Sequence, residues 1–168
     1  MEKFNDKRVL ITGGASGIGR IMGALALEKG AAALVIWDIN QANIDNTLSE
    51  LSTKGKVFGY RVDISDEQAV IAAAQRVKTE VGEVDILINC AGIITGNKTF
   101  DKCSSEDINR TLSINTVAPM VVTMQFLPDM IARNSGHICN ISSAGGLISN
   151  PRMSIYAASK WAVIGWSD

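Results

Sequence analysis

The sequence has few cysteines, no long apolar run and no leader-like N-terminus. Its three cysteines, Cys90, Cys103 and Cys139, are odd in number and widely spaced, which favours neither a disulfide framework nor a CxxC metal site. No apolar stretch reaches the roughly 18 residues that a membrane-spanning helix needs. The segment from Met1 to Arg8 is polar rather than signal-like. We therefore predict a cytoplasmic protein with no metal centre and no membrane partner.

A strong excess of charge of either sign is also missing. Sixteen Lys and Arg residues stand against seventeen Asp and Glu residues, for a formal net charge of −1. Because no basic run forms the footprint that a phosphate backbone requires, we expect no nucleic-acid partner. The chain has 168 residues, of which 46% are hydrophobic, and it contains neither an internal repeat nor a Pro-rich or Gly/Ser-rich linker. This composition predicts one domain over residues 1–168.

Short apolar runs alternate with segments of helical spacing. The runs that we interpret as buried strands are Arg8–Thr12, Leu34–Asp38, Lys56–Val62, Asp85–Asn89 and His137–Ser142. Strands that alternate with helices and are buried on both faces predict a parallel sheet with right-handed crossovers. The expected fold class is α/β, a Rossmann-like doubly wound parallel sheet in three α/β/α layers.

Capping residues mark the ends of the expected helices. Gly30 stands where the first helix needs a left-handed C-terminal residue. Ser65 followed by Gln68 has the spacing of a capping box, which predicts a helix from about Asp66 to Glu80, closed by Gly82.

A glycine-rich loop joins the first strand to the first helix. It reads Thr12-Gly13-Gly14-Ala15-Ser16-Gly17-Ile18-Gly19. Glycines there let the backbone approach a pyrophosphate at the positive end of a helix. The spacing is G-x3-G-x-G, and no Lys follows as in a P-loop. We predict a dinucleotide site at Gly13, Ala15, Ser16, Gly17, Ile18 and Gly19. A glycine-rich turn without a ligand is the alternative.

The choice between nicotinamide cofactors depends on Asp38, which ends the second strand about 20 residues past the loop. A carboxylate there accepts hydrogen bonds from the adenosine ribose and repels a 2′-phosphate. Ser16, Ile39 and Asn40 supply no cation for such a phosphate, and Arg20 is the only nearby one. We predict that NAD(H) is preferred over NADP(H). The alternative is that Asp38 is a solvated turn residue or the cap of the next helix.

A tyrosine and a lysine four residues apart are the strongest catalytic signal. Tyr156-Ala157-Ala158-Ser159-Lys160 places the phenol and the ammonium on one helical face, one turn apart. A nearby cation stabilises a phenolate, so such a pair is suited to acid-base chemistry. A YxxxK pattern also arises on helices by chance.

These motifs, taken together, resemble the classical short-chain dehydrogenase/reductase family. TGGASGIG is similar to the family's TGxxxGIG signature, and YAASK to its YxxxK motif. Asn89-Cys90-Ala91-Gly92 resembles the NNAG segment, from which Cys90 departs. The resemblance implies that Asn89, Ala91 and Gly92 lie beside the cofactor and that Asp63 meets the adenine. Asp63 also fits a turn or cap residue.

The resemblance also implies a catalytic tetrad. Ser143 would orient the substrate oxygen, Tyr156 would move its proton, and Lys160 would stabilise the phenolate and hold the nicotinamide ribose. Ser142 is the alternative to Ser143. Asn115 would anchor a water that links Lys160 to solvent.

Asn115 is expected inside a long helical segment from about Ser105 to Arg133. Pro119 lacks the N–H that would bond the Asn115 carbonyl, which frees this carbonyl for a water. An ordinary helix kink is the other interpretation.

We therefore expect an oxidoreductase that acts on the CH–OH group of a small-molecule alcohol, or on the matching carbonyl. In the family, the Asn-bearing and Tyr-bearing helices form the main subunit interface, which implies a homodimer or a homotetramer. Family members usually continue past the YxxxK helix, so we expect the chain to end within a helix at Asp168 and to lack the family's C-terminal strands. The alternative function is a catalytically inactive dinucleotide-binding fragment or an interaction module.

Overall fold

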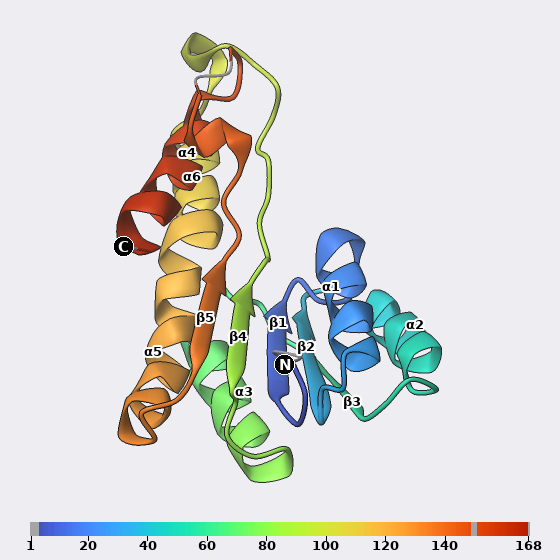
Figure 1. Cartoon of the computed structure of the whole chain (residues 1–168). Helices are drawn as coiled ribbons and strands as arrows, with labels where there is room; N and C mark the ends of the chain where they lie inside the picture. Colours follow the sequence, from blue (N-terminus) through green and yellow to red (C-terminus); the bar gives the residue numbers. More distant parts are fainter. Residues whose placement is uncertain (1–3, 149–150, 168) are drawn as a thin grey trace.

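The structure is a computed structural model that describes residues 4–148 and 151–167. Five strands alternate with helices along the chain (Figure 1). The strands are β1 (Arg8–Thr12), β2 (Ala33–Asp38), β3 (Val57–Arg61), β4 (Ile86–Asn89) and β5 (His137–Asn140). The helices are α1 (Gly17–Glu28), α2 (Gln41–Leu51), α3 (Glu67–Glu80), α4 (Ser105–Leu112), α5 (Ala118–Ala132) and α6 (Ser154–Ser167). Short turns are η1 (Phe100–Lys102), η2 (Ser113–Val117) and η3 (Ala144–Gly146).

The five strands form one parallel sheet in the order β3-β2-β1-β4-β5. All five predicted strands are confirmed, with ends that differ by at most two residues. The strand order reverses between β1 and β4, so the loops after these strands lead away to opposite sides. Such a switch point leaves a crevice outside the carboxyl ends of the strands, which is where open α/β sheets bind ligands.

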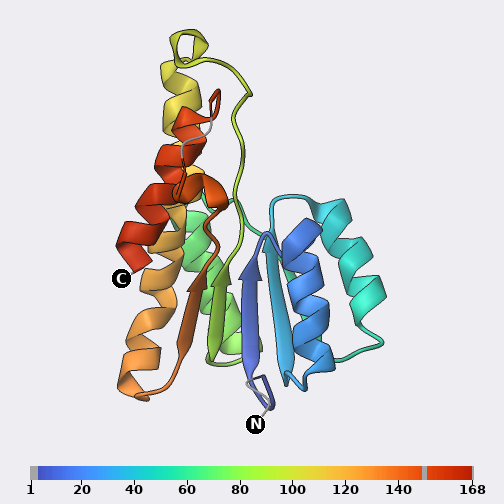
Figure 2. The ribbon, with the colours of Figure 1, turned by 45° about the horizontal axis from the view of Figure 1, so that its top comes forward.

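Helices cover both faces of the sheet (Figure 2). Leu34, Ile36, Leu27 and Ile44 belong to a buried core between the sheet and α1 and α2. On the other face, α3 and α5 bury a second core, in which Trp37 packs on Phe126 with ring centroids 5.8 Å apart. The predicted three-layer, doubly wound α/β fold is thereby confirmed.

The predicted helix from Ser105 to Arg133 forms, but it contains a π-turn. Between α4 and α5, the N–H of Ala118 donates to the carbonyl of Ser113, five residues earlier. A π-turn adds one residue to a helical turn and re-aims the side chains that follow it, often at functional sites. Here it contains Asn115, whose side chain is buried. The proposed water at the Asn115 carbonyl stays a prediction.

The predicted capping box before α3 is wrong, although the helix itself forms. The residue that caps α3 is Asp66, whose carboxylate accepts from the N–H groups of Gln68 and Ala69. The hydroxyl of Ser65 donates instead to the Asp63 carboxylate at 2.6 Å. Because both residues precede the helix and both carry a capping oxygen, spacing alone could not decide between them. Gly82 does close the helix end with a φ of 104°.

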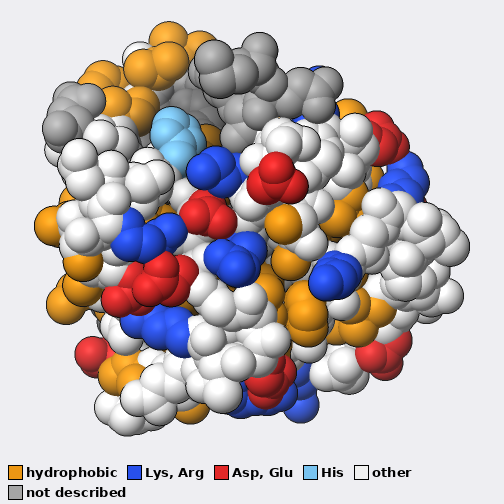
Figure 3. All heavy atoms as spheres, turned by 60° about the horizontal axis from the view of Figure 1, so that its bottom comes forward, with side chains coloured by type: hydrophobic (Ala, Val, Ile, Leu, Met, Phe, Trp, Pro, Cys, Tyr) orange, Lys and Arg blue, Asp and Glu red, His pale blue; other side chains and the backbone are white. Residues whose placement is uncertain are grey.

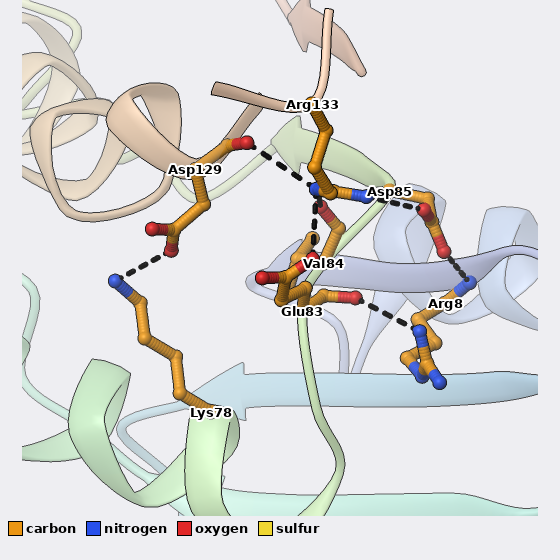
Figure 4. Close-up of polar contacts among 7 residues, drawn as sticks. All are labelled: Arg8, Lys78, Glu83, Val84, Asp85, Asp129 and Arg133. Carbon is orange, nitrogen blue, oxygen red and sulfur yellow. Dashed lines mark hydrogen bonds and ion pairs between the residues drawn. The ribbon is translucent and has the colours of Figure 1, made fainter. Parts of the chain in front are cut away.

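A polar cluster ties the end of α5 to the beginning of β4 (Figure 4). The Arg133 guanidinium bonds the Asp85 carboxylate at 2.9 Å, the Val84 carbonyl at 2.9 Å and the Glu83 carboxylate at 2.9 Å. The other Asp85 oxygen accepts from the backbone N–H of Arg8, at the beginning of β1. This cluster fixes β1, β4 and α5 to one another at the amino ends of the strands, on the opposite side of the sheet's length from the crevice.

The face at the amino ends of the strands mixes basic and acidic side chains (Figure 3). In the described part of the chain, no helix is both long and apolar enough to cross a membrane. The predicted end of the chain within a helix at Asp168 lies outside the described residues, since α6 is described only to Ser167.

We predict that Arg133→Gln lowers the free energy of unfolding of this chain by about 1–3 kcal/mol, because it leaves the largely buried Asp85 carboxylate without its cation. Urea unfolding measures the change. The control is Lys54→Gln, which removes an exposed pair with Glu28 and should cost less than about 0.5 kcal/mol. Equal stabilities of the two variants would contradict a structural role for the cluster.

Candidate dinucleotide-binding and catalytic site

A cavity of about 610 Å³ opens at the carboxyl ends of the strands. This volume lies within the range of about 300–1,000 Å³ that small-molecule sites occupy. The glycine loop, the end of β2 and the loop after β3 form one end of the cavity, and the segment after β5 and helix α6 form the other. Predicted residues that line it come from both ends and include Gly13, Gly17, Asp38, Gly92, Tyr156 and Lys160.

The glycine loop is shaped to receive a ligand against its backbone. Gly17 has a φ of 49°, and a Cβ there would meet no atom within 4 Å, so a side chain would extend into open space. A Cβ at Gly13 would come within 2.9 Å of the Ala91 Cα, because the loop packs directly on the segment after β4. The side chain of Ser16 makes no capping hydrogen bond to α1. The first N–H groups of this helix are therefore available to an anion, and the loop fits a pyrophosphate.

The other predicted residues of the loop divide between the cavity wall and the core. Ser16, Ile18 and Gly19 line the cavity. Ala15 does not line it. Its side chain is buried, its N–H donates to Asp38, and its carbonyl accepts from Thr47. Ala15 therefore holds the loop in place from behind.

Asp38 lies in the cavity wall and is held there by two backbone groups. Its carboxylate accepts from the N–H of Ala15 at 3.2 Å and from the N–H of Asn40 at 3.0 Å. The alternative that Asp38 caps the next helix is wrong, because the side chain of Asn40 caps α2 through the N–H of Asn43. Asp38 therefore joins the loop to the β2 end and presents its carboxylate beside the cavity.

The cations near Asp38 differ from those expected. Arg20 pairs with Glu50 at 2.8 Å and does not line the cavity. Arg61, the neighbour of Asp38 across the β2–β3 register, donates through Nε to the carbonyl of Ile39 at 3.2 Å. Sequence spacing could not identify Arg61, because strand register decides which residues are neighbours.

Asp63 serves two purposes. It lines the cavity. It also accepts from the N–H of Ser65 at 2.9 Å, as the turn interpretation required. The turn interpretation of Asp63 is thereby confirmed, and its contact with the adenine stays a prediction.

The segment after β4 is organised by Thr12, to which the sequence analysis gave no role. The buried Thr12 hydroxyl accepts from the N–H of Cys90 at 3.1 Å and from the N–H of Ala91 at 3.2 Å. These bonds hold Ala91 and Gly92 in the cavity wall.

The side chain of Asn89 lies on the α5 side of the sheet and not in the cavity wall. Its amide donates to the Thr123 hydroxyl at 3.0 Å and to the Asn140 carboxamide at 2.8 Å. Asn89 therefore supports the junction of β4, β5 and α5 rather than the cavity surface.

Asn115 joins the segment after β4 to helix α6. Its carboxamide oxygen accepts from the N–H of Ile93 at 2.8 Å, and its amide nitrogen donates to the Ile93 carbonyl at 2.9 Å. The same nitrogen donates to the Ser159 hydroxyl at 3.0 Å, which in turn donates to the carbonyl of Tyr156. Asn115 does not line the cavity itself, but it holds two segments that do.

Lys160 is a buried cation at the α6 end of the cavity. Its ammonium donates to the Ile141 carbonyl at 2.7 Å and lies 5.9 Å from the centre of the Tyr156 ring. Burial lowers the pKa of Lys160, because the charged form loses its hydration, and the Cys90 thiol nearby acts in the opposite direction. A Cβ at Gly92 would lie 3.3 Å from Asn115 Oδ1 and 3.5 Å from Lys160 Nζ. The absence of a side chain at Gly92 thus lets these groups approach one another.

The two candidate serines have different partners. The Ser142 hydroxyl lines the cavity but donates to the carbonyl of Lys160 at 2.8 Å. The Ser143 hydroxyl accepts from the N–H of Gly145 at 3.1 Å. A Cβ at Gly145 would lie 3.6 Å from Ser143 Oγ and 3.5 Å from the Tyr156 ring, so Ser143 and Tyr156 flank one point.

The structure adds cavity residues that sequence reasoning missed. Arg110 and Ile114, on α4 and in the π-turn, line the cavity, as do Ile93 and Ile94 after β4. Among residues 4–148 and 151–167, no group of three His, Cys, Asp or Glu side chains could hold a metal ion.

Comparisons with known proteins agree with this geometry. A model of the short chain dehydrogenase family matches residues 7–168. Epidermal retinol dehydrogenase 2 from Mus musculus is 41% identical over 162 residues, which cover 95% of this chain and 52% of the mouse protein. Estradiol 17-beta-dehydrogenase 11 from Homo sapiens is 38% identical over 161 residues, with coverages of 94% and 52%. The chain spans about half the length of the curated relatives it matches.

Solved structures of similar fold include NAD+-bound xylitol dehydrogenase, with a TM-score of 0.93 and 30% identity. The match covers 98% of this chain and 63% of that one. Levodione reductase has a TM-score of 0.92 and 29% identity, with coverages of 98% and 64%.

We predict that Lys160 loses its proton at a lower pH than an ordinary lysine, because burial penalises its charged form. NMR of the chain with isotopically methylated lysines measures the titration, and the signal that disappears in Lys160→Gln assigns it. The sign follows from desolvation: the neutral amine is favoured in the folded chain, so the midpoint lies below about 10.4, the usual lysine value. A midpoint at or above that value would refute the burial argument.

Proposed function

The chain belongs to the short-chain dehydrogenase family, and we propose that it transfers a hydride between NAD(H) and an alcohol or carbonyl substrate. One observation carries the proposal: a single cavity joins the glycine loop and Asp38 at one end to Tyr156 and Lys160 at the other. A dinucleotide is long enough to occupy both ends of the cavity, with its pyrophosphate at the glycine loop and its nicotinamide ring beside Tyr156 and Lys160.

Bound nicotinamide would supply or accept the hydride, and the chain's own residues would handle binding and the proton. In our proposal, Tyr156 gives its phenol proton to the substrate oxygen during reduction and takes it back during oxidation. Ser143, which flanks the same point as the Tyr156 ring, holds that oxygen by a hydrogen bond. The Lys160 ammonium, near the ring, stabilises the phenolate and holds the nicotinamide ribose.

Asn115 would act through its neighbours. Its amide holds Ile93 in the cavity wall and Ser159 on α6, and it therefore sets the position of Lys160 beside Gly92. We propose that Asn115 also completes the proton path from Lys160 to solvent through a water.

We propose that NAD(H) is preferred over NADP(H). Asp38 supports this preference, since its carboxylate stands in the cavity wall and a 2′-phosphate beside it would add like charge. Arg61 is the opposing feature: it lies next to Asp38 in the sheet, although its Nε is bonded to the Ile39 carbonyl.

Apolar side chains in the cavity wall favour an apolar alcohol as substrate. Ile93, Ile94 and Ile114 line the cavity. Relatives named for retinol and estradiol, both large apolar alcohols, support the same substrate class.

A homodimer or homotetramer is part of the proposal. Apolar side chains are exposed on α5 and α6, namely Met124 and Ile131 on α5 and Trp161 on α6. A contiguous exposed apolar surface favours association, and a second copy of the chain is the occupant that the family resemblance implies.

We predict that the chain binds NADH at least about tenfold more tightly than NADPH, and that Asp38→Asn reduces this ratio by about tenfold because it removes a charge beside the 2′-position. Isothermal titration calorimetry measures both affinities. Asp45→Asn, an equal loss of charge on the exposed face of α2, should leave the ratio unchanged. Binding of neither cofactor would argue against the enzyme and favour an interaction module.

We predict that Tyr156→Phe lowers kcat for an apolar secondary alcohol by at least about 100-fold, since the proton donor is lost, while the affinity for NADH stays the same. NADH absorbance follows turnover of the protein. The control is Tyr60→Phe, which removes a phenol bonded to Glu80 and should retain activity. Full activity of Tyr156→Phe would overturn the proposed mechanism.

A further inference from the structure

Arg110 is the one described basic side chain in the cavity wall besides Lys160. The two cations differ in their surroundings. Lys160 is buried and bonded to the carbonyl of Ile141. Arg110 is exposed to the cavity, and none of the residues 4–148 and 151–167 forms an ion pair or a hydrogen bond with its guanidinium. A cation without a protein partner in the wall of a site for an anionic ligand is available to that ligand.

The acidic side chains on α4 do not neutralise Arg110. Asp107, three residues earlier on α4, is at the spacing from which a carboxylate pairs with an arginine. Its carboxylate is already engaged, because it forms an ion pair with Lys98 at 2.6 Å and accepts from the N–H of Ser104 at 2.8 Å. These contacts hold the pKa of Asp107 at about 2, with the Lys98 bond as the largest cause. Asp107 is therefore engaged with Lys98 and Ser104, and Glu106, four residues before Arg110, forms no ion pair with it either.

Arg110 and Asn115 lie on different faces of the helical segment that carries both. Arg110 and Ile114 are four residues apart, so they share one face, and both line the cavity. The adjacent face carries Asn115, which is directed at Ile93 and at Ser159 of α6. The face of Arg110 is therefore rotated by about 100° from the face that bonds α6. Across the cavity from α6 are the ends of β2 and β3, which mark the adenosine end.

We propose that Arg110 binds the adenosine diphosphate half of the dinucleotide. The inference rests on the proposed function, because it assumes that a dinucleotide occupies this cavity. A planar guanidinium recognises both groups that this half presents: it pairs with phosphate oxygens and stacks on an aromatic ring. Arg110 would add a positive charge at an end of the site where Asp38 and Asp63 supply negative charge.

The test compares the two halves of the ligand. Affinities for ADP-ribose, nicotinamide mononucleotide and NADH are measured by calorimetry or by competition with NADH fluorescence, for the unmodified chain and for Arg110→Gln. We expect Arg110→Gln to weaken ADP-ribose and NADH about fivefold, as an exposed cationic contact does, and to leave nicotinamide mononucleotide unchanged. If the loss of affinity becomes smaller in high salt, Arg110 contacts the phosphates. If the loss of affinity is the same in high salt, Arg110 contacts the adenine. Both results support the proposal.

Two further variants make the result interpretable. Arg110→Lys keeps the charge but not the planar fork, and we expect it to recover part of the affinity. Arg76→Gln removes the same charge from α3, where Arg76 pairs with Glu80 outside the cavity wall, and should change no affinity. Because Arg110 is exposed, its variants should unfold at the same urea concentration as the unmodified chain.

The outcomes separate this inference from the proposed function. If the unmodified chain binds neither NADH nor ADP-ribose, the proposed function fails, and this inference fails with it. If the unmodified chain binds both and Arg110→Gln binds ADP-ribose equally well, only the inference fails. A loss confined to nicotinamide mononucleotide would place Arg110 at the opposite end and would also overturn it.

Discussion

The buried amide of Asn115 is the interaction on which the catalytic end of the molecule depends. It bonds both backbone groups of Ile93, much as a neighbouring strand would, and it also bonds Ser159 of α6. Three segments far apart in the sequence thereby meet at one side chain. The π-turn makes this possible, since the extra residue in the helical turn lets Asn115 reach the segment after β4 while α4 and α5 continue on either side. Replacing this amide would leave two partly buried backbone groups of Ile93 without these partners, which is costly.

Burial of the Lys160 ammonium lowers the stability of the fold but strengthens the effect of its charge on Tyr156. The buried Lys160 ammonium bonds the Ile141 carbonyl, and within residues 4–148 and 151–167 no carboxylate forms an ion pair that would offset its loss of hydration. The same burial strengthens the field that the cation exerts on Tyr156, because nearby water would screen it. A fold that needed only stability would favour an apolar residue at this position. The retained charge therefore fits a site that handles a proton.

The charged side chains in the cavity wall differ between its two ends. Asp38 and Asp63 stand at the ends of β2 and β3, whereas Lys160 stands on α6. Arg110 reaches the cavity from α4, and we place it at the end that carries Asp38 and Asp63. Such an arrangement suits a ligand with distinct polar groups at separate places, because each end of the cavity offers a different electrostatic environment. It suits a uniformly charged or wholly apolar ligand less well.

The strands, the glycine loop and the Tyr156–Lys160 pair could be recognised in the sequence, because hydrophobic period, capping glycines and one-turn spacing are local properties. The sequence also identified Asn115 and Asp38, but not what they bond. Three features could not be predicted before the folded chain was known: Asn89 lies on the α5 side of the sheet, Thr12 holds the segment after β4, and Arg110 lines the cavity. The physical reason is that these outcomes depend on strand register and on the packing of helices distant in sequence. The sequence gives the chemical type of each side chain, whereas the groups that it contacts depend on which distant segments the fold brings beside it.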